Sequence, residues 1–392
     1  MNKKDITFLL RYGFLKPDSI DQKIFFNRTL YDYDDAIIAI NSTLQRILKK
    51  IPSENLTVLL SGGIDSTVIL VNAVSAGIPV KSLSIKFDDY DESSFAKRLS
   101  EHLNCKNETI EYSFDYFKVF FENMLSDKKI LVSSAAMVVF SDVLSRNNGD
   151  FINGAASDEG LFGYDYQVKF LKKINRKNQY QTLFPKGFNE LIPKHSLLNE
   201  FFANERLDSF FHDDYMPIYL DDEELFELFS VKTDKNFPFI LKDAFDELIR
   251  FQYEVLLPEC QLKRLEGISK YSGRKIFVPY AEKDIINVFN SLSNDLILRS
   301  FKRKYILYEC VRQNIPEELY LRDKFPFTVP INKWFLQNKE WVLELVLYYG
   351  GKHNIDEKKL KWVVNKNLNN GNDYNAAEKL LLLIGTLAFF SD

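Results

Sequence analysis

The chain has 392 residues, of which 46% are apolar and 27% charged, and its formal net charge is −4. This length supports a large core and favours two domains, while the acidic balance argues against a broad basic surface for tRNA or DNA. The 3 cysteines contain no CxxC pair and no even-numbered framework, so we expect neither a zinc site nor disulfides, and a cytoplasmic location.

No membrane segment or signal peptide is expected. The N-terminal lysines precede a short apolar stretch that Arg11 interrupts, and no small-residue cleavage site follows it. The longest apolar run, Leu380 to Phe390, is too short to cross a bilayer.

From residue 56 onward, periodicity predicts alternating strands and helices. Strands are expected at 56–60, 78–87, 107–114 and from 150, with helices at 67–74, 88–104 and 133–147. This alternation is typical of an α/β fold with a doubly wound parallel sheet, in which ligands bind at the carboxyl ends of the strands.

The chain therefore divides into three predicted parts. Residues 1–55 form a short N-terminal segment, a remnant or a linker, and 56–166 form the α/β core. Residues 167–392 read as a mainly helical region that packs over the sheet and closes the cleft.

A loop of small residues, SGGIDS at positions 61–66, separates the first strand from the first helix. Glycines let backbone approach a ligand closely, and a helix N-terminus attracts anions, so this loop suits phosphate. A tight turn in which Ser61 or Asp65 caps the helix fits the local pattern equally well. The GxxxxGK[ST] loop that binds a γ-phosphate does not occur in the sequence.

Four segments resemble, in the same order, motifs of the asparagine synthetase family, a branch of the PP-loop ATP pyrophosphatases. SGGIDS is similar to SGGxDS, and NGAASDEGLFGY (153–164) to SGEGADELFGGY. RKIFVPYAEKDIINVFNSL (274–292) resembles ExRxPFLDxxxxEFxxxL, and PEELYLRDKFPFTVPINKWF (316–335) resembles PxxIxxRxKxGFxxPxxxWF. The resemblance implies a PP-loop fold and an enzyme that cleaves ATP between its α- and β-phosphates to adenylate a substrate.

It also implies an ATP site built from both small-residue loops and the strand before Phe87. The residues expected to bind the nucleotide are Ser61, Gly62, Gly63, Asp65, Ser66, Ser84, Lys86, Asn153 and Gly154. Asp65 and Asp158 would share a Mg²⁺ ion that bridges the phosphates, because this hard cation seeks carboxylate oxygens. Lys324, assisted by Arg322, would place positive charge where charge builds during adenylation or attack on the acyl-adenylate.

The sequence departs from the family where a base and substrate contacts are expected. Ala155 replaces the glutamate, or the tyrosine of β-lactam synthetases, that assists proton removal from the attacking nitrogen. Glu159 and Glu266 are acids in the right segments, although structural or capping roles suit them better. Lys275 and Phe277 replace the family's Glu and Arg.

Position 2 is Asn2 rather than the catalytic cysteine of a glutaminase domain, and no such domain fits before residue 56. LLRYGFLKPDSI (9–20) resembles the linker of lasso-peptide cyclases.

The expected function is an ATP-dependent amide-forming ligase that joins a small-molecule or peptide carboxylate to an amine, in specialised or natural-product metabolism. Ammonia-dependent amidation, PP-loop chemistry on tRNA and a catalytically silent binding protein are the alternatives. A separate glutaminase or other partner protein is compatible with the sequence, whereas nucleic acid and membrane partners are not expected.

Overall fold

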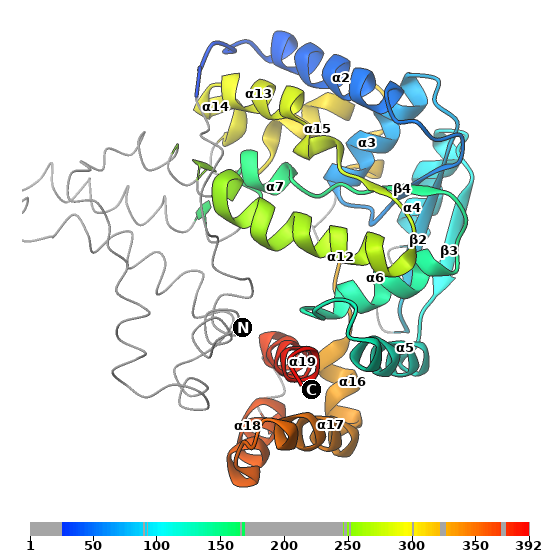
Figure 1. The fold of residues 1–392 in the computed structure, drawn as a ribbon. Helices are drawn as coiled ribbons and strands as arrows, with labels where there is room; N and C mark the ends of the chain where they lie inside the picture. Colours follow the sequence, from blue (N-terminus) through cyan, green and yellow to red (C-terminus); the bar gives the residue numbers. More distant parts are fainter. Residues whose placement is uncertain are drawn as a thin grey trace, which may run out of the picture.

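The computed structural model describes most of the chain outside one long central segment (Figure 1). The described residues are 26–88, 91, 93–164, 167–168, 246, 249–250, 252–299, 302–321, 327–369 and 374–391.

A parallel sheet with strand order β3-β2-β1-β4-β5 forms the centre of the fold. Its strands are β1 (Leu56–Leu59), β2 (Val80–Lys86), β3 (Asn107–Glu111), β4 (Asp150–Ile152) and β5 (Ile276–Phe277). Leu56 pairs with Val80 on one side and with Asp150 on the other, so β1 is central and all strands share one direction. The predicted parallel α/β sheet is confirmed.

Side chains alternate across β1, as the two-residue period of a strand requires. Leu56 and Val58 join one buried cluster, and Leu59 joins a second cluster on the opposite face. Each face therefore needs its own cover of helices.

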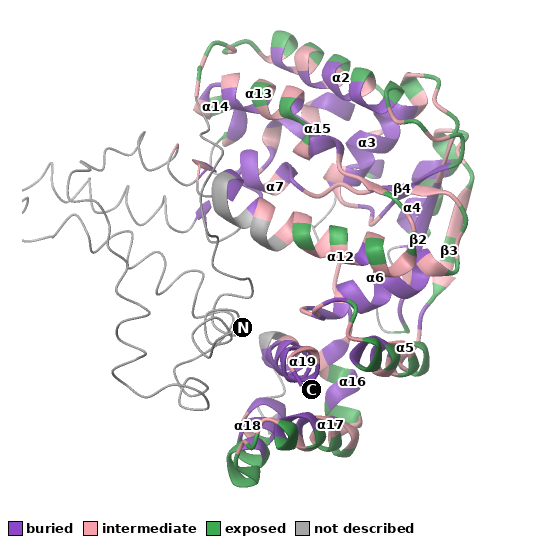
Figure 2. Ribbon diagram, viewed as in Figure 1, coloured by how far each residue is buried: buried purple, intermediate pink, exposed green. Residues whose placement is uncertain are grey.

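Helices from both ends of the sequence cover the first face of the sheet (Figure 1). They are α2 (Tyr33–Lys49), α3 (Ile64–Ser75), α4 (Ser93–His102), α13 (Lys283–Ser291), α14 (Asn294–Ile297) and α15 (Tyr305–Val311). Figure 2 shows that α3 is mostly buried, whereas α2 exposes its outer face. Since α2 packs against α3 and α13, residues 33–49 belong to the folded core.

The second face is covered by α5, α6 and α12, with a C-terminal helical group beyond them. These elements are α5 (Phe114–Asp127), α6 (Ala135–Ser145), α12 (Lys263–Ser272), α16 (Ile331–Gln337), α17 (Lys339–Lys352), α18 (Glu357–Asn369) and α19 (Tyr374–Phe389). Helices on both faces confirm the doubly wound arrangement.

Two features of the region predicted as mainly helical were not expected from the sequence. β5 extends the sheet beside β4, although it comes from the region predicted as helical. An 11-residue π-helix (Gln252–Leu262), with Pro258 inside it, leads into α12. In the described part of the chain, no helix is both long and apolar enough to span a membrane.

Candidate active site

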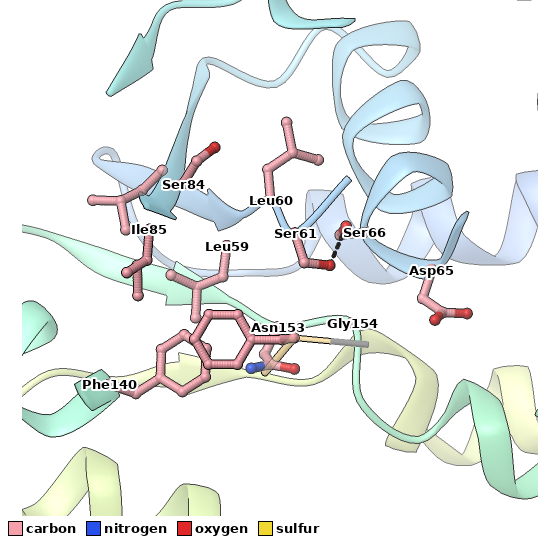
Figure 3. Close-up of a pocket in the computed structure, with 12 residues that line it drawn as sticks. Leu59, Leu60, Ser61, Asp65, Ser66, Ser84, Ile85, Phe140, Asn153 and Gly154 are labelled. Atoms are coloured by element: carbon pink, nitrogen blue, oxygen red, sulfur yellow. Dashed lines mark hydrogen bonds between the residues drawn. The ribbon is translucent and has the colours of Figure 1, made fainter. Parts of the chain in front are cut away.

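A cavity of about 190 Å³ opens at the carboxyl ends of β1, β2 and β4. It is lined by Leu59, Leu60, Ser61, Asp65, Ser66, Leu83, Ser84, Ile85, Phe140, Asn153, Gly154 and Phe327. Figure 3 shows Leu59, Ile85 and Phe140 at one end and Ser61 and Asp65 toward the other. The cavity therefore has one apolar and one polar end.

Two stacked rings form part of the apolar end. Phe140 of α6 and Phe327 have ring centroids 4.9 Å apart at an interplanar angle of 28°. Phe327 also contacts Phe87, whose side chain is buried just after β2. This wall can cover the face of a flat apolar group such as a nucleobase.

The loop between β1 and α3 forms the polar end. Gly62 has φ of +69°, a conformation that glycine adopts without strain. Gly63 precedes α3, and among the described residues no side chain caps this helix. Ser66 instead donates its hydroxyl to the Gly63 carbonyl at 3.1 Å. The capped-turn alternative is thus disfavoured, and the N–H groups of the first turn face a site that suits an anion.

The loop after β4 packs directly on this first loop. A Cβ placed on Gly154 would lie only 3.1 Å from the Ser66 nitrogen, so glycine permits the close approach. The Asn153 side chain accepts the Ala155 N–H at 2.8 Å and thereby fixes the turn. Asp65 and Asp158, which are distant in sequence, meet as a result.

The two acids share one cation, the ammonium group of Lys304. Its Nζ lies 2.7 Å from both Asp65 oxygens and also forms an ion pair with Asp158. Ser157 completes the group, because its hydroxyl donates to Asp65 at 2.7 Å and accepts from Lys304 at 3.1 Å. Sequence reasoning missed Lys304, since a lysine in the basic run 302–304 carries no signal that separates it from its neighbours.

The backbone holds Lys304 in an unusual position. Its φ of +53° is uncommon for a residue with a side chain and costs about 1–2 kcal/mol. A Cβ on Gly163 would overlap both the Asp158 carboxylate and the Lys304 side chain. Only a glycine at position 163 therefore leaves room for this ion pair.

Burial and charge act in opposite directions on these groups. Burial alone would lower the pKa of Lys304, but Asp158 and Asp65 raise that pKa above its ordinary value. The neighbouring Glu159 is buried and lies beside Asp158, and these two factors raise its pKa to about 7, against the lowering effect of the Tyr164 hydroxyl. Because the two carboxylates outweigh burial at Lys304, its ammonium group stays charged.

The acid pair fits a magnesium ion bound with nucleotide. Within the described ranges no three His, Cys, Asp or Glu residues form a metal cluster. Mg²⁺, however, commonly takes only one or two carboxylates and fills its other positions with water and phosphate oxygens. Asp65 and Asp158 already converge on a single cation, so they have the geometry to hold such an ion.

Most predicted nucleotide contacts lie together. Ser61, Asp65, Ser66, Ser84, Asn153 and Gly154 all line the cavity, while Gly62 and Gly63 shape its loop. Lys86 does not line the cavity and pairs instead with Glu111 at 3.2 Å. Arg322 and Lys324 lie outside the described residues.

No acid occupies the cavity near Ala155 in the described part of the chain, apart from Asp65. Glu159 is buried away from it and accepts a hydrogen bond from Tyr164 at 2.7 Å. Glu266 is exposed in the first turn of α12. Phe277 lies in β5, where its carbonyl accepts the Asn153 N–H at 2.9 Å, so the substitution falls beside the site.

The left-handed conformation of Ala156 yields a stability prediction. Its φ is +75°, at the position where the family motif SGEGADE has its second glycine. We expect Ala156→Gly to change the free energy of unfolding by less than about 0.5 kcal/mol, because relief of about 1–2 kcal/mol of strain offsets the lost methyl group and the added chain entropy.

Ala73 provides the matched control, since it is equally buried but lies within α3. Ala73→Gly should cost about 2 kcal/mol in helix propensity and burial. Urea unfolding of both variants measures the difference, and equal costs would contradict the strain at Ala156.

Comparison with known proteins adds a family match. A sequence model described as asparagine synthase matches residues 46–385. No curated protein matches the chain.

Solved structures with similarity include NMN synthetase from Francisella tularensis, at 18% identity and a TM-score of 0.27, covering 62% of this chain and 93% of that one. NAD+ synthetase from Burkholderia pseudomallei has 13% identity and a TM-score of 0.23, covering 69% and 93%. Because these TM-scores are low, we assign the topology of this chain from its own strand order and not from these structures.

Proposed function

Because the chain belongs to the asparagine synthase family, as the match over residues 46–385 shows, we propose that it is an ATP-dependent ligase that forms amide bonds. It would transfer AMP from ATP to a carboxylate, release pyrophosphate, and let an amine displace AMP from the acyl-adenylate. Family membership supports the general class, a ligase that uses ATP. The finer reaction is our proposal.

The observation that carries this proposal is the two-ended cavity. Its apolar end, with Ile85 and Phe140, suits an adenine ring, and Ser84 adds a polar atom of β2. Its polar end offers the hydroxyls of Ser61 and Ser66 at the start of α3, where the helix dipole favours negative charge. A nucleotide bound in this way extends its phosphates toward the acid pair.

Charge near the phosphates comes from this chain's own residues. Lys304 lies beside the polar end, because it contacts Asp65, which lines the cavity, and Asp158. We propose that Mg²⁺ is held by these two acids together with the phosphates, where it would neutralise the leaving pyrophosphate. Lys324 and Arg322 are proposed to stabilise the negative charge that develops at the α-phosphate.

The nucleophile is proposed to be an amine carried by an organic substrate. Ala155 cannot accept a proton. Among the described residues, Asp65 is the only acid that lines the cavity. An amine held beside the adenylate gains effective concentration, worth roughly 7–11 kcal/mol in well-oriented cases, which offsets a weak base. Ammonia offers few contacts by which to be held, so it needs delivery from a separate glutaminase.

One assay tests the reaction. The purified chain is incubated with ATP, Mg²⁺ and pools of carboxylates and amines, and nucleotides are quantified by mass spectrometry. We expect AMP and pyrophosphate in equal amounts, whereas ADP and phosphate would refute adenylation. Nucleotide turnover that requires tRNA, or absent turnover despite tight ATP binding, would favour the tRNA enzyme or the silent homologue.

The same assay identifies the nucleophile. Ammonium salts and candidate amines are compared at matched concentrations of the unprotonated form, and saturable use of an organic amine is expected. Efficient use of ammonia alone, with a primary amide as product, would replace the organic amine by ammonia and leave the ligase assignment in place.

A further inference from the structure

We propose that Lys304 serves as an internal cation for Asp65 and Asp158, so that a divalent metal binds these acids only together with a nucleotide. This inference rests on the proposed function for the identity of the nucleotide. It adds an order of binding: a divalent metal alone does not bind Asp65 and Asp158, whereas a metal together with a polyphosphate does.

The contacts of Lys304 are those of a cation in a binding site. Its Nζ lies 2.7 Å from each oxygen of Asp65, pairs with Asp158 as well, and donates to Ser157 at 3.1 Å. The lysine side chain is 3% exposed, against 16% for Asp65 and 25% for Asp158. A metal that used the same oxygens would therefore have to displace the ammonium group.

Charge balance sets the cost of that displacement. The two carboxylates carry two negative charges, and Lys304 leaves the group with a net charge of about −1. A divalent cation entering alone would meet a positive group already in contact with its ligands, and the displaced ammonium would lose both of its carboxylate partners. Exchanging a well-paired buried cation without a new acceptor is costly.

A polyphosphate changes this balance. Its oxygens supply new acceptors for the ammonium group and the remaining ligands for a magnesium-like ion, which prefers phosphate and water beside one or two carboxylates. Because α3 begins at the same place, the phosphates would arrive where Lys304 can turn to them.

The fold commits Lys304 to this position before any ligand arrives. Its φ of +53° directs the start of α15, and its N–H is held by the Leu161 carbonyl at 3.2 Å. Gly163 lacks the side chain that would block its path to Asp158. These constraints distinguish it from Lys302 in the same basic run, which is exposed and lies over the rings of Tyr305 and Tyr308.

The test measures binding of Mn²⁺, as a spin-active substitute for Mg²⁺, by electron paramagnetic resonance. The wild-type chain should show no tight site with Mn²⁺ alone and one site when α,β-methylene-ATP is added. Lys304→Met should bind Mn²⁺ without nucleotide at least about 10-fold more tightly than wild type, whereas the control Lys302→Met should match wild type.

The outcomes are separable. Equal Mn²⁺ affinity of wild type with and without nucleotide, or a folded Lys304→Met variant with no gain in affinity, would overturn the role of Lys304. If circular dichroism shows that this variant does not fold, the wild-type comparison decides alone. Failure of the nucleotide itself to bind wild type, followed by equilibrium dialysis, would instead count against the proposed function.

Discussion

The Asp158→Asn variant is expected to fold and to lose AMP formation by on the order of 100-fold or more, as removal of one preorganised charge at a reacting phosphate does in other enzymes. Asp158 is 25% exposed and contacts Lys304, so the neutral amide keeps the shape of the side chain but leaves the lysine with one carboxylate partner. Asp65→Asn should lose at least as much activity, because Asp65 also accepts the Ser157 hydroxyl.

Asp284→Asn is the matched control for these two variants. Asp284 of α13 forms an exposed ion pair with Arg46 of α2, and solvent screens such a pair so that it contributes little to stability. It should retain wild-type turnover and melting behaviour. AMP release at saturating ATP and at limiting Mg²⁺, with thermal melts of all three variants, checks the prediction, and near-normal activity of Asp158→Asn at limiting Mg²⁺ would contradict it.

Local pattern was sufficient to place both loops of the site. SGGIDS and NGAAS each follow an apolar run, and parallel strands end at one edge of a sheet, so the pattern predicted that both loops lie there. That Asp65 and Asp158 meet at this edge was implied by the resemblance to the asparagine synthetase family, and the structure brings them together on Lys304. The strands β1 to β4 and helix α3 were predicted from hydrophobic periodicity, because the spacing of apolar residues changes between 2 in the strands and 3.6 in the helix.

Contacts between residues far apart in the sequence could not be predicted from local patterns. Lys304 reaches Asp65 across 239 positions of sequence, and nothing in its neighbourhood distinguishes it from Lys302. Phe140 looks like an ordinary inward residue of α6, although it lines the cavity. The strand β5 has only 2 residues, too few for a period, and pairing with β4 alone defines it.

Gly163→Ala is expected to have the other large effect, on both stability and turnover. The added methyl group would overlap the Asp158 carboxylate and the Lys304 side chain, which cannot move apart without losing the ion pair. Overpacking of this kind costs about 1–3 kcal/mol of unfolding free energy. Because the displaced groups are those proposed to meet the phosphates, AMP formation should fall by roughly 100-fold as well.

Gly351→Ala isolates the effect of position from the effect of the methyl group. Gly351 lies near the end of α17, where a Cβ would meet nothing within 4 Å, so alanine should stabilise the chain by about 0.5–1 kcal/mol through helix propensity. The same chemical change thus has opposite expected signs at the two sites. Urea unfolding and the AMP assay measure both, and a Gly163→Ala variant with normal stability and turnover would show that Lys304 and Asp158 do not depend on their contact beside residue 163.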